Sequence, residues 1–444
     1  MIGALRRHLA SPELLRQLQE LAAGAPAAAP VSLTLDLGRC ATDWLAALPA
    51  IGPFWYQARP ASGHYQLGIG HALQVTSAGA NRFAALDNAF SGLANHWRRN
   101  ATALAFCGFA FDEHSQTSMP NALLAIPAVL VETRDGRCLT TLSTPAGKIG
   151  QAPAHWQQLL ATPAPRHGYR LLPAGERMLA DRAWIARVRA ALRDIAGQQL
   201  DKIVLTRNRH LQASAPIPAG RLLGALLDQQ PDSLVYAYGN GATVFLGATP
   251  ERLVRLAAGR IEADALAGTA WPGSPALDAP KNRHEQSLVV AAIVAALEKC
   301  CTHPPSAGPV EVRAAGTVSH LRSLVTGCAG EGITIFDLVR ALHPTPAVGG
   351  FPTGAALDWL AAHGERRSGW YSGGFGSISA AGDGEFSVAL RSALISGSSL
   401  ELQAGAGIVA GSDPEQELAE TEAKFGTLLG ALTAAPARKP NRLG

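Results

Sequence analysis

Short runs that are dominated by apolar residues, or that alternate between apolar and polar ones, recur in the first third of the chain. Residues 31–35, 102–109 and 128–133 form three such runs, and each predicts a strand of a buried or half-buried sheet. We find no group of residues in this third with the composition of a catalytic site. A proline-bearing stretch at 152–173 follows, and we interpret it as the link between two halves of the protein.

The hydrophobic period changes after this link. Apolar residues recur at the 3.6-residue helical spacing and predict an amphipathic helix, with Trp184, Ile185, Val188, Leu192 and Ile195 on one face. Strands and helices then follow in an irregular order, which indicates packed α+β layers and not a doubly wound parallel sheet. The expected elements are strands at 201–207, 243–247, 251–256, 261–269, 386–395 and 400–404, a turn at 257–259, an apolar helix at 285–299, a loop at 343–346 and a last helix from Pro414.

Composition and charge exclude several classes of protein. The chain has 444 residues, of which 47% are hydrophobic and 16% charged, so it can bury a large core. No apolar run reaches the roughly 18 residues of a membrane span. The first residues have no continuous apolar stretch and no clear cleavage site, so we expect no secretory signal. The net charge of +4 is small and no basic stripe is interleaved with aromatic residues, so nucleic acid is not an expected partner.

The six cysteines show no C-x-x-C spacing, which argues against a zinc site. Free thiols in a reducing compartment are the plain interpretation, and we therefore expect a cytoplasmic protein. The basic tail at 437–442 is expected to be frayed and solvated.

Two acidic segments could hold a metal ion. Glu285 opens the apolar helix, where a lone glutamate is more often a first-turn carboxylate favoured by the helix dipole than a magnesium ligand. In the last helix Glu417, Glu420 and Lys424 share one face, and a solvated Glu–Lys pair is the simpler interpretation of that face taken alone. The glycine-rich run at 404–409 leads into this helix and raises the odds of an anion site. Ser412 and Glu415 fit a capping box, with Pro414 in the first turn, and are expected to be structural.

Other polar residues lie in apolar surroundings. Lys202 precedes an apolar strand: if it points inward, desolvation lowers its pKa and makes it a general base, and if it points outward it is an ordinary strand lysine. Glu251 follows a turn and is either an acid with a raised pKa or a charge at a strand end. Arg391, expected within an apolar strand, needs a carboxylate partner from the protein or from a substrate. His320 and Tyr371, each taken alone, are more often structural groups than ligands.

Six ordered blocks in the second half resemble the chorismate-utilising enzymes, a family that includes isochorismate, salicylate, anthranilate and aminodeoxychorismate synthases. The resemblance runs from about residue 180 to 432 and is weak in the N-terminal half. It implies one large α+β fold, a layered α/β/β/α sandwich with two packed antiparallel sheets and helices outside. Residues 1–174 would form the N-terminal half of the sandwich, 175–435 the chorismate-binding catalytic region and 436–444 a disordered basic tail. The six blocks are 201–205, 246–253, 265–269, 281–285, 342–350 and 405–409.

The resemblance also implies roles for individual residues. Lys202 matches the base that activates water, and Glu251 matches the acid that protonates the departing hydroxyl. Glu285 and Glu420 match direct Mg²⁺ ligands, with Glu417 close by and acting through water. The positions that match substrate-binding groups are Thr269, His320, Tyr371, Arg391, Gly407 and Lys424.

Within the family, three features favour isochorismate synthase. Ala267 stands where the aminodeoxychorismate synthases carry a nucleophilic lysine, and the N-terminal region lacks the Leu-Leu-Glu-Ser motif of feedback-regulated anthranilate synthases. The run at 343–347 looks more like isochorismate synthases than salicylate synthases. We expect Mg²⁺-dependent conversion of chorismate to isochorismate, without an obligatory partner subunit. The alternatives are a salicylate synthase, which goes on to eliminate pyruvate, and a non-catalytic chorismate-binding homologue. The product could feed menaquinone, siderophore or salicylate synthesis.

Overall fold

The computed structural model describes residues 2–39, 44–49, 52–115, 117–134, 136–161, 167–173, 175, 177–241, 243–274, 276–316 and 318–434. Part of the predicted link, residues 162–166, and the predicted tail at 436–444 lie outside these ranges.

The described strands form one long hydrogen-bonded ladder. It runs from β14 through β15, β12, β11, β18, β17, β5, β6, β3, β2, β9, β10, β19 and β20 to β8, and β7 and β1 branch from β6. Neighbouring strands are antiparallel except for β1 and β4. The strands are β1 (Pro30–Arg39), β2 (Phe54–Arg59), β3 (His64–Ser77), β4 (Arg98–Arg99), β5 (Leu104–Phe109), β6 (Ala122–Arg134), β7 (Arg137–Pro145), β8 (Lys202–Gln212), β9 (Leu234–Gly239), β10 (Val244–Thr249), β11 (Arg252–Ala257), β12 (Arg260–Ala270), β13 (Ser306–Ala307), β14 (Glu311–Ala315), β15 (Val318–Cys328), β16 (Gly350–Phe351), β17 (Gly374–Ser379), β18 (Gly384–Val388), β19 (Ser392–Ser396) and β20 (Ser399–Val409).

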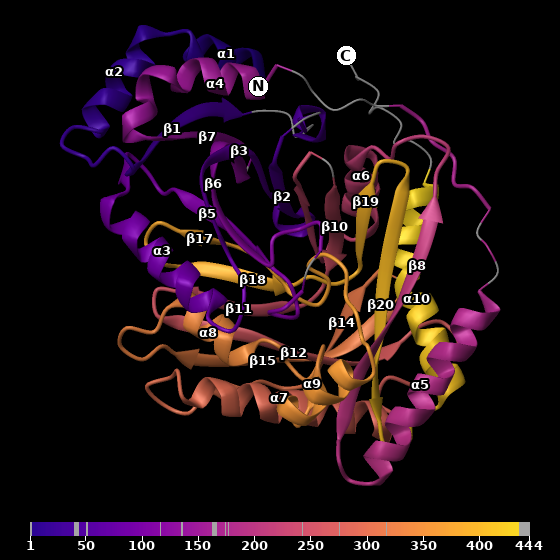
Figure 1. Cartoon of the computed structure of the whole chain (residues 1–444). Coiled ribbons are helices and arrows are strands. Elements are labelled where there is room, and N and C mark those ends of the chain that lie inside the picture. The colour runs from indigo at the N-terminus through magenta and orange to yellow at the C-terminus, as the bar shows by residue number, and fades with distance from the viewer. Residues whose placement is uncertain are drawn as a thin grey trace.

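Helices cover the outer faces of this ladder (Figure 1). Helix α7 contacts β12 and β15 near one end of the ladder, α8 contacts β11 and β18, and α5 and α10 contact β20 at the other end. The predicted α+β sandwich with helices outside is confirmed. The helices are α1 (Ile2–Leu9), α2 (Pro12–Leu21), α3 (Arg82–His96), α4 (Ala152–Leu159), α5 (Met178–Ala196), α6 (Ala219–Gln229), α7 (Pro280–Glu298), α8 (Ile335–Leu342), α9 (Thr353–Ala362) and α10 (Pro414–Thr433).

Strand β8 is buried on both faces at its start, which explains its continuous apolar run. Ile203 and Leu205 pack in one hydrophobic cluster with Trp184 of α5 and Trp359 of α9. Because successive strand residues point to opposite faces, Lys202 and Val204 point away from these helices, into the interior. The same alternation in β20 places Ala406 and Ile408 in this cluster and leaves the glycines of the strand on the interior face.

The predicted strand at 386–395 is wrong in its middle. Strand β18 ends at Val388 and β19 begins at Ser392, and Arg391 between them has a left-handed backbone with φ of 51°. The break has a topological reason: β18 pairs with β11 and β17, whereas β19 pairs with β10 and β20. The chain therefore passes from one part of the ladder to another at Arg391.

Three predicted boundaries near the acidic segments also change. Helix α7 begins at Pro280, so Glu285 lies in its second turn and does not open the helix. The glycine-rich run at 404–409 is the end of β20, and its ladder with β8 continues to Val409. The N-cap of α10 is Asp413, whose side chain accepts from the Gln416 amide at 2.8 Å, and not Ser412.

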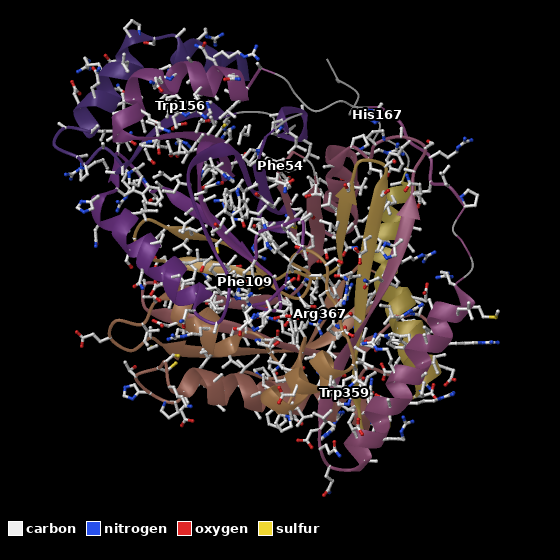
Figure 2. The ribbon with its side chains drawn as sticks, in the orientation of Figure 1. Phe54, Phe109, Trp156, His167, Trp359 and Arg367 are labelled. Atoms are coloured by element: carbon white, nitrogen blue, oxygen red, sulfur yellow. The ribbon has the colours of Figure 1, made fainter. Side chains whose placement is uncertain are left out.

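Strands from both predicted halves interleave. Strand β5 pairs with β17, and β2 pairs with β9. Trp55 and Phe106 share a buried aromatic cluster with Trp370 and Phe375, so the interior is common to both halves. Trp156 of α4, fully buried, belongs to a second core that also contains apolar residues of α6 and α10 (Figure 2).

In the described ranges, no helix combines the length and the apolar character that crossing a membrane requires. Cys107, Cys300, Cys301 and Cys328 are free cysteines.

Candidate active site

Lys202 and Glu285 form a buried ion pair at the centre of the site. Lys202 Nζ lies 2.9 Å from Glu285 Oε1, and their side chains are 1% and 9% exposed. Burial raises the pKa of Glu285, but Lys202 and Lys281 together hold it below its ordinary value, so this carboxylate is charged. Lys202 therefore points inward, and its role as a general base stays a prediction.

Two further lysine–carboxylate pairs lie beside this one. Lys424 Nζ is 2.6 Å from Glu420 Oε1 and donates to the Gly405 carbonyl at 2.7 Å. Lys281 Nζ is 2.8 Å from Glu417 Oε1 and 4.0 Å from Glu285 Oε2. Glu417 and Glu420 are buried, so the solvated face that is the simpler interpretation of their spacing is wrong.

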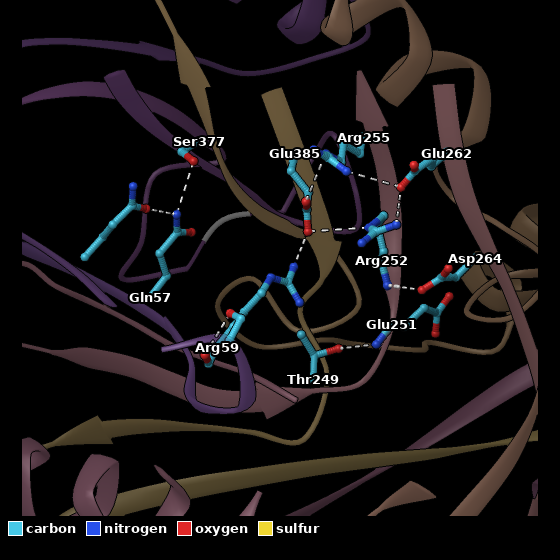
Figure 3. Close-up of polar contacts among 12 residues, drawn as sticks. Gln57, Arg59, Thr249, Glu251, Arg252, Arg255, Glu262, Asp264, Ser377 and Glu385 are labelled. Atoms are coloured by element: carbon cyan, nitrogen blue, oxygen red, sulfur yellow. Dashed lines mark hydrogen bonds and ion pairs between the residues drawn. The ribbon is translucent and has the colours of Figure 1, made fainter. Parts of the chain in front are cut away.

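Glu251 is held in the opposite protonation state. It lies between β10 and β11, is 3% exposed, and burial together with the nearby Asp264 carboxylate raises its pKa to about 8. Figure 3 shows Glu251 beside Asp264, which in turn pairs with Arg322 at 2.7 Å. Its backbone amide donates to Thr249 Oγ1 at 3.2 Å, which fixes the turn after β10. At neutral pH Glu251 is therefore a protonated acid, the first of its two predicted alternatives.

His320 and Arg391 form a buried polar pair. Arg391 Nη2 lies 2.8 Å from His320 Nε2, and because a guanidinium only donates, this ring nitrogen is the acceptor. The ring proton is then on Nδ1, which donates to the Gly268 carbonyl at 3.0 Å. Burial and the Arg391 charge hold the pKa of His320 well below its ordinary value, so the ring is neutral. Since the ring only orients it, Arg391 retains donors for a substrate carboxylate, and no carboxylate in the described ranges forms an ion pair with it.

A bulge in β12 aims Thr269 at this pair. The register between β12 and β15 shifts between Ala267 and Thr269, and Gly268 there has φ of 62°. Thr269 then lies opposite His320, with Oγ1 3.3 Å from Nδ1.

Gly407 is a glycine because there is no room for a side chain. A Cβ at this position would lie 2.3 Å from Glu285 Oε1 and 2.9 Å from Lys202 Cε. Tyr371 is buried on the same side, and burial raises the pKa of its hydroxyl to about 12, so it stays a hydrogen-bond donor. A Cβ at Gly405 would be 3.3 Å from that hydroxyl.

One inner cavity brings most of the predicted site residues together. Lys202 lies behind its wall at Gly407, and Glu417 lines an adjoining outer cavity that also includes Thr269, Lys281 and Glu420. The predicted site residues that line the inner cavity are Glu251, Thr269, Glu285, His320, Tyr371, Arg391, Gly407, Glu420 and Lys424.

Known proteins share this arrangement of elements. A family of chorismate-binding enzymes, represented by its sequence model, matches residues 22–433. The chain belongs to this family. The match includes most of the N-terminal half, which lies outside the six sequence blocks.

Several members of the chorismate-binding family resemble this chain. The salicylate biosynthesis isochorismate synthase of Pseudomonas aeruginosa is 33% identical over 416 residues, which cover 86% of this chain and 85% of that protein. The isochorismate synthase MenF of Bacillus subtilis is 36% identical over 260 residues, 56% of this chain and 55% of that protein. The solved structure of the menaquinone-specific isochorismate synthase of Escherichia coli has a TM-score of 0.77 at 26% identity, covering 94% of this chain and 98% of that one.

Within the described ranges no three His, Cys, Asp or Glu side chains are gathered closely enough to hold a metal ion. Each predicted magnesium ligand is paired with a lysine instead. Glu417 nevertheless fits a cation: its Oε2 is buried without a hydrogen-bond partner. Burial and the Glu420 charge raise the pKa of Glu417 to about 7, opposed by Lys281 and more weakly by the Ser412 hydroxyl. The Mg²⁺ site on these carboxylate oxygens therefore stays a prediction. Carboxylate oxygens are the ligands that Mg²⁺ prefers, so the residues present fit it.

Two residues that matter in this member of the family were missing from the sequence-based site. Asp264 is in β12, directly before the matched block at 265–269, and only the fold brings it to Glu251. Lys281 is the first residue of a matched block, but the sequence does not show that this residue of α7 contacts Glu417 of α10.

Proposed function

We propose that this protein is an isochorismate synthase. In the reaction, water adds at C2 of chorismate, the ring double bond shifts, and the C4 hydroxyl leaves. The observation that carries the proposal is one cavity lined by a glutamic acid that is protonated at neutral pH, with the buried Lys202 directly behind its wall at Gly407. The water must lose a proton and the departing hydroxyl must gain one, so the reaction needs both groups at once.

Lys202 acts as the base and Glu251 as the acid. Lys202 Nζ lies 2.9 Å from Glu285 Oε1, so this contact fixes the position of the amine behind the cavity wall. Glu251 holds its proton up to about pH 8 and delivers it to the C4 oxygen. Arg391, Tyr371 and the backbone at Gly407 are placed to hold the carboxylates of the substrate.

Glu285 and Glu420, with Glu417 in support, would hold one Mg²⁺. When bound, that ion supplies positive charge for the ring carboxylate of the substrate. The support is the chemistry of the donors: carboxylates from two helices, one with a buried oxygen that lacks a partner.

We further propose that one chain is sufficient and that it works in the cytoplasm. The candidate base, acid, metal ligands and substrate-binding groups all belong to this chain. The free thiols of Cys107, Cys300, Cys301 and Cys328 suit a reducing compartment. Relatives named for menaquinone and for salicylate synthesis both resemble this chain, so we propose isochorismate as the product and no particular later use of it.

The purified protein incubated with chorismate, with and without Mg²⁺, tests the proposal by product identification. We expect isochorismate, Mg²⁺-dependent, without stoichiometric pyruvate. Salicylate and pyruvate appearing together would instead identify a salicylate synthase, and no turnover at all would leave a chorismate-binding homologue.

A further inference from the structure

Lys281 lies where the inner and outer cavities meet. It is in the first turn of α7, and its ammonium is between the carboxylates of Glu417, at 2.8 Å, and Glu285, at 4.0 Å. Glu285 lines the inner cavity, Glu417 the outer one, and Glu420 lines both. The Lys281 ammonium is therefore among the three oxygen donors proposed for the metal.

The charges of this cluster already balance. Three carboxylates face three ammonium groups, in the pairs Lys202–Glu285, Lys281–Glu417 and Lys424–Glu420. A divalent cation added to this set leaves an excess of two positive charges in a buried place, which is unfavourable. Entry of the ion therefore requires that at least one lysine turn away.

Lys281 is the lysine best able to do so. Its side chain is 25% exposed, against 1% for Lys202 and 15% for Lys424. Lys424 also donates to the Gly405 carbonyl, whereas Lys281 has no bond to a carbonyl among the described residues. Lys281 is also at the N-terminal end of α7, where the helix dipole disfavours a positive charge.

We propose that Lys281 is a built-in counter-ion that substitutes for the metal in the metal-free protein and is displaced when Mg²⁺ binds. It holds the carboxylates of α7 and α10 together when no ion is present and, by competing for the same oxygens, lowers the apparent Mg²⁺ affinity. This role rests on the proposed metal-dependent function.

The test is Mg²⁺ binding without substrate, measured by titration calorimetry on the wild-type protein, Lys281→Met and Lys281→Arg. Thermal unfolding of each protein is followed in EDTA. We expect Lys281→Met to bind Mg²⁺ roughly tenfold more tightly, the gain from removing one charged hydrogen bond that competes for the ligands. In EDTA we expect the same variant to melt at a lower temperature, because Glu417 then has no counter-ion. Lys281→Arg keeps the ion pair and should bind Mg²⁺ like the wild type.

Arg283→Met is the matched control. Arg283 is in the same first turn of α7, is 69% exposed and pairs with Asp278 at 3.6 Å. Its loss changes the charge of the helix equally without touching the carboxylates, so its Mg²⁺ affinity should stay at the wild-type value.

Equal or weaker binding by Lys281→Met, or an equal gain in Arg283→Met, would overturn the counter-ion role. If neither wild type nor Lys281→Met binds Mg²⁺, both the role and the metal site are wrong. Isochorismate formation by the wild type with and without Mg²⁺ then shows separately whether the proposed reaction stands.

Discussion

The two ends of the candidate site hold the same kind of side chain in opposite states. Glu285 and Glu251 are both glutamates, and both are buried. Glu285 has Lys202 at 2.9 Å and a lowered pKa, whereas Glu251 has Asp264 as a like-charged neighbour and a pKa raised to about 8.

The difference shows that burial alone does not decide the charge of a carboxyl group in this cavity. Burial raises the pKa of both glutamates, and the sign of the nearest charge then separates them. At one end, the charge of Glu285 is compensated by its ion pair with Lys202. The other end is an acid kept neutral for proton donation, at a cost to stability once the surroundings are alkaline.

Replacing the lysine of the charged end should have the largest effect. Lys202→Met removes the proposed base, so turnover of chorismate should fall by roughly 10²–10⁴-fold. It also leaves Glu285 buried and unpaired, so the free energy of unfolding should drop by about 3–5 kcal/mol. Chorismate turnover and urea unfolding measure the two effects.

The double variant Lys202→Met/Glu285→Gln separates the loss of turnover from the loss of stability. Without the orphaned charge, much of the lost stability should return while turnover stays as low as in Lys202→Met. A single Lys202→Met variant that turns over chorismate at the wild-type rate would exclude Lys202 as the base.

At the neutral end, loss of activity and gain of stability should go together. Glu251→Gln removes the proton donor, so turnover should fall by about 10²–10⁴-fold. The raised pKa of Glu251 means that its contribution to stability is fully present below pH 4.5 and is lost as the pH rises towards about 8. Glutamine does not titrate, so the variant should be more stable than the wild type by about 1–3 kcal/mol at pH 7. Urea unfolding at pH 5 and pH 8 should show the gap widening with pH, and a gap that is constant would contradict a raised pKa.

A smaller effect should come from replacing Asp264, whose charge helps to make the pKa of Glu251 differ from that of Glu285. Asp264→Asn removes the negative charge beside Glu251 and lowers its pKa. The alkaline fall of activity, expected near pH 8 in the wild type, should then move to lower pH, as a kcat–pH profile will show. Glu262→Gln is the control, because Glu262 is on the same strand and pairs with Arg252 at 2.7 Å. An alkaline limb that moves equally in both variants would exclude a specific action of Asp264.

Much of the site could be predicted because its residues lie in short ordered blocks. The pairs that decide its chemistry could not, since their partners are far apart in the chain: Lys202 and Glu285 are 83 positions apart by number, on a strand and a helix. Arg391 illustrates the same limit. Its apolar neighbours predict a continuous strand, but the need to pass between two parts of the ladder breaks that strand at a left-handed residue.

The sequence by itself determined the α+β class, the positions of most strands and helices, and the family, because these depend on local period and on ordered motifs. It left open whether Lys202 points inward and whether Glu417 and Glu420 are solvated. The tertiary structure decided both, since α5 and α9 cover one face of β8 and leave Lys202 on the other, and α10 packs on β20 with Glu417 and Glu420 buried. It also decided which glutamate is charged, because pKa depends on neighbours that only the fold brings together.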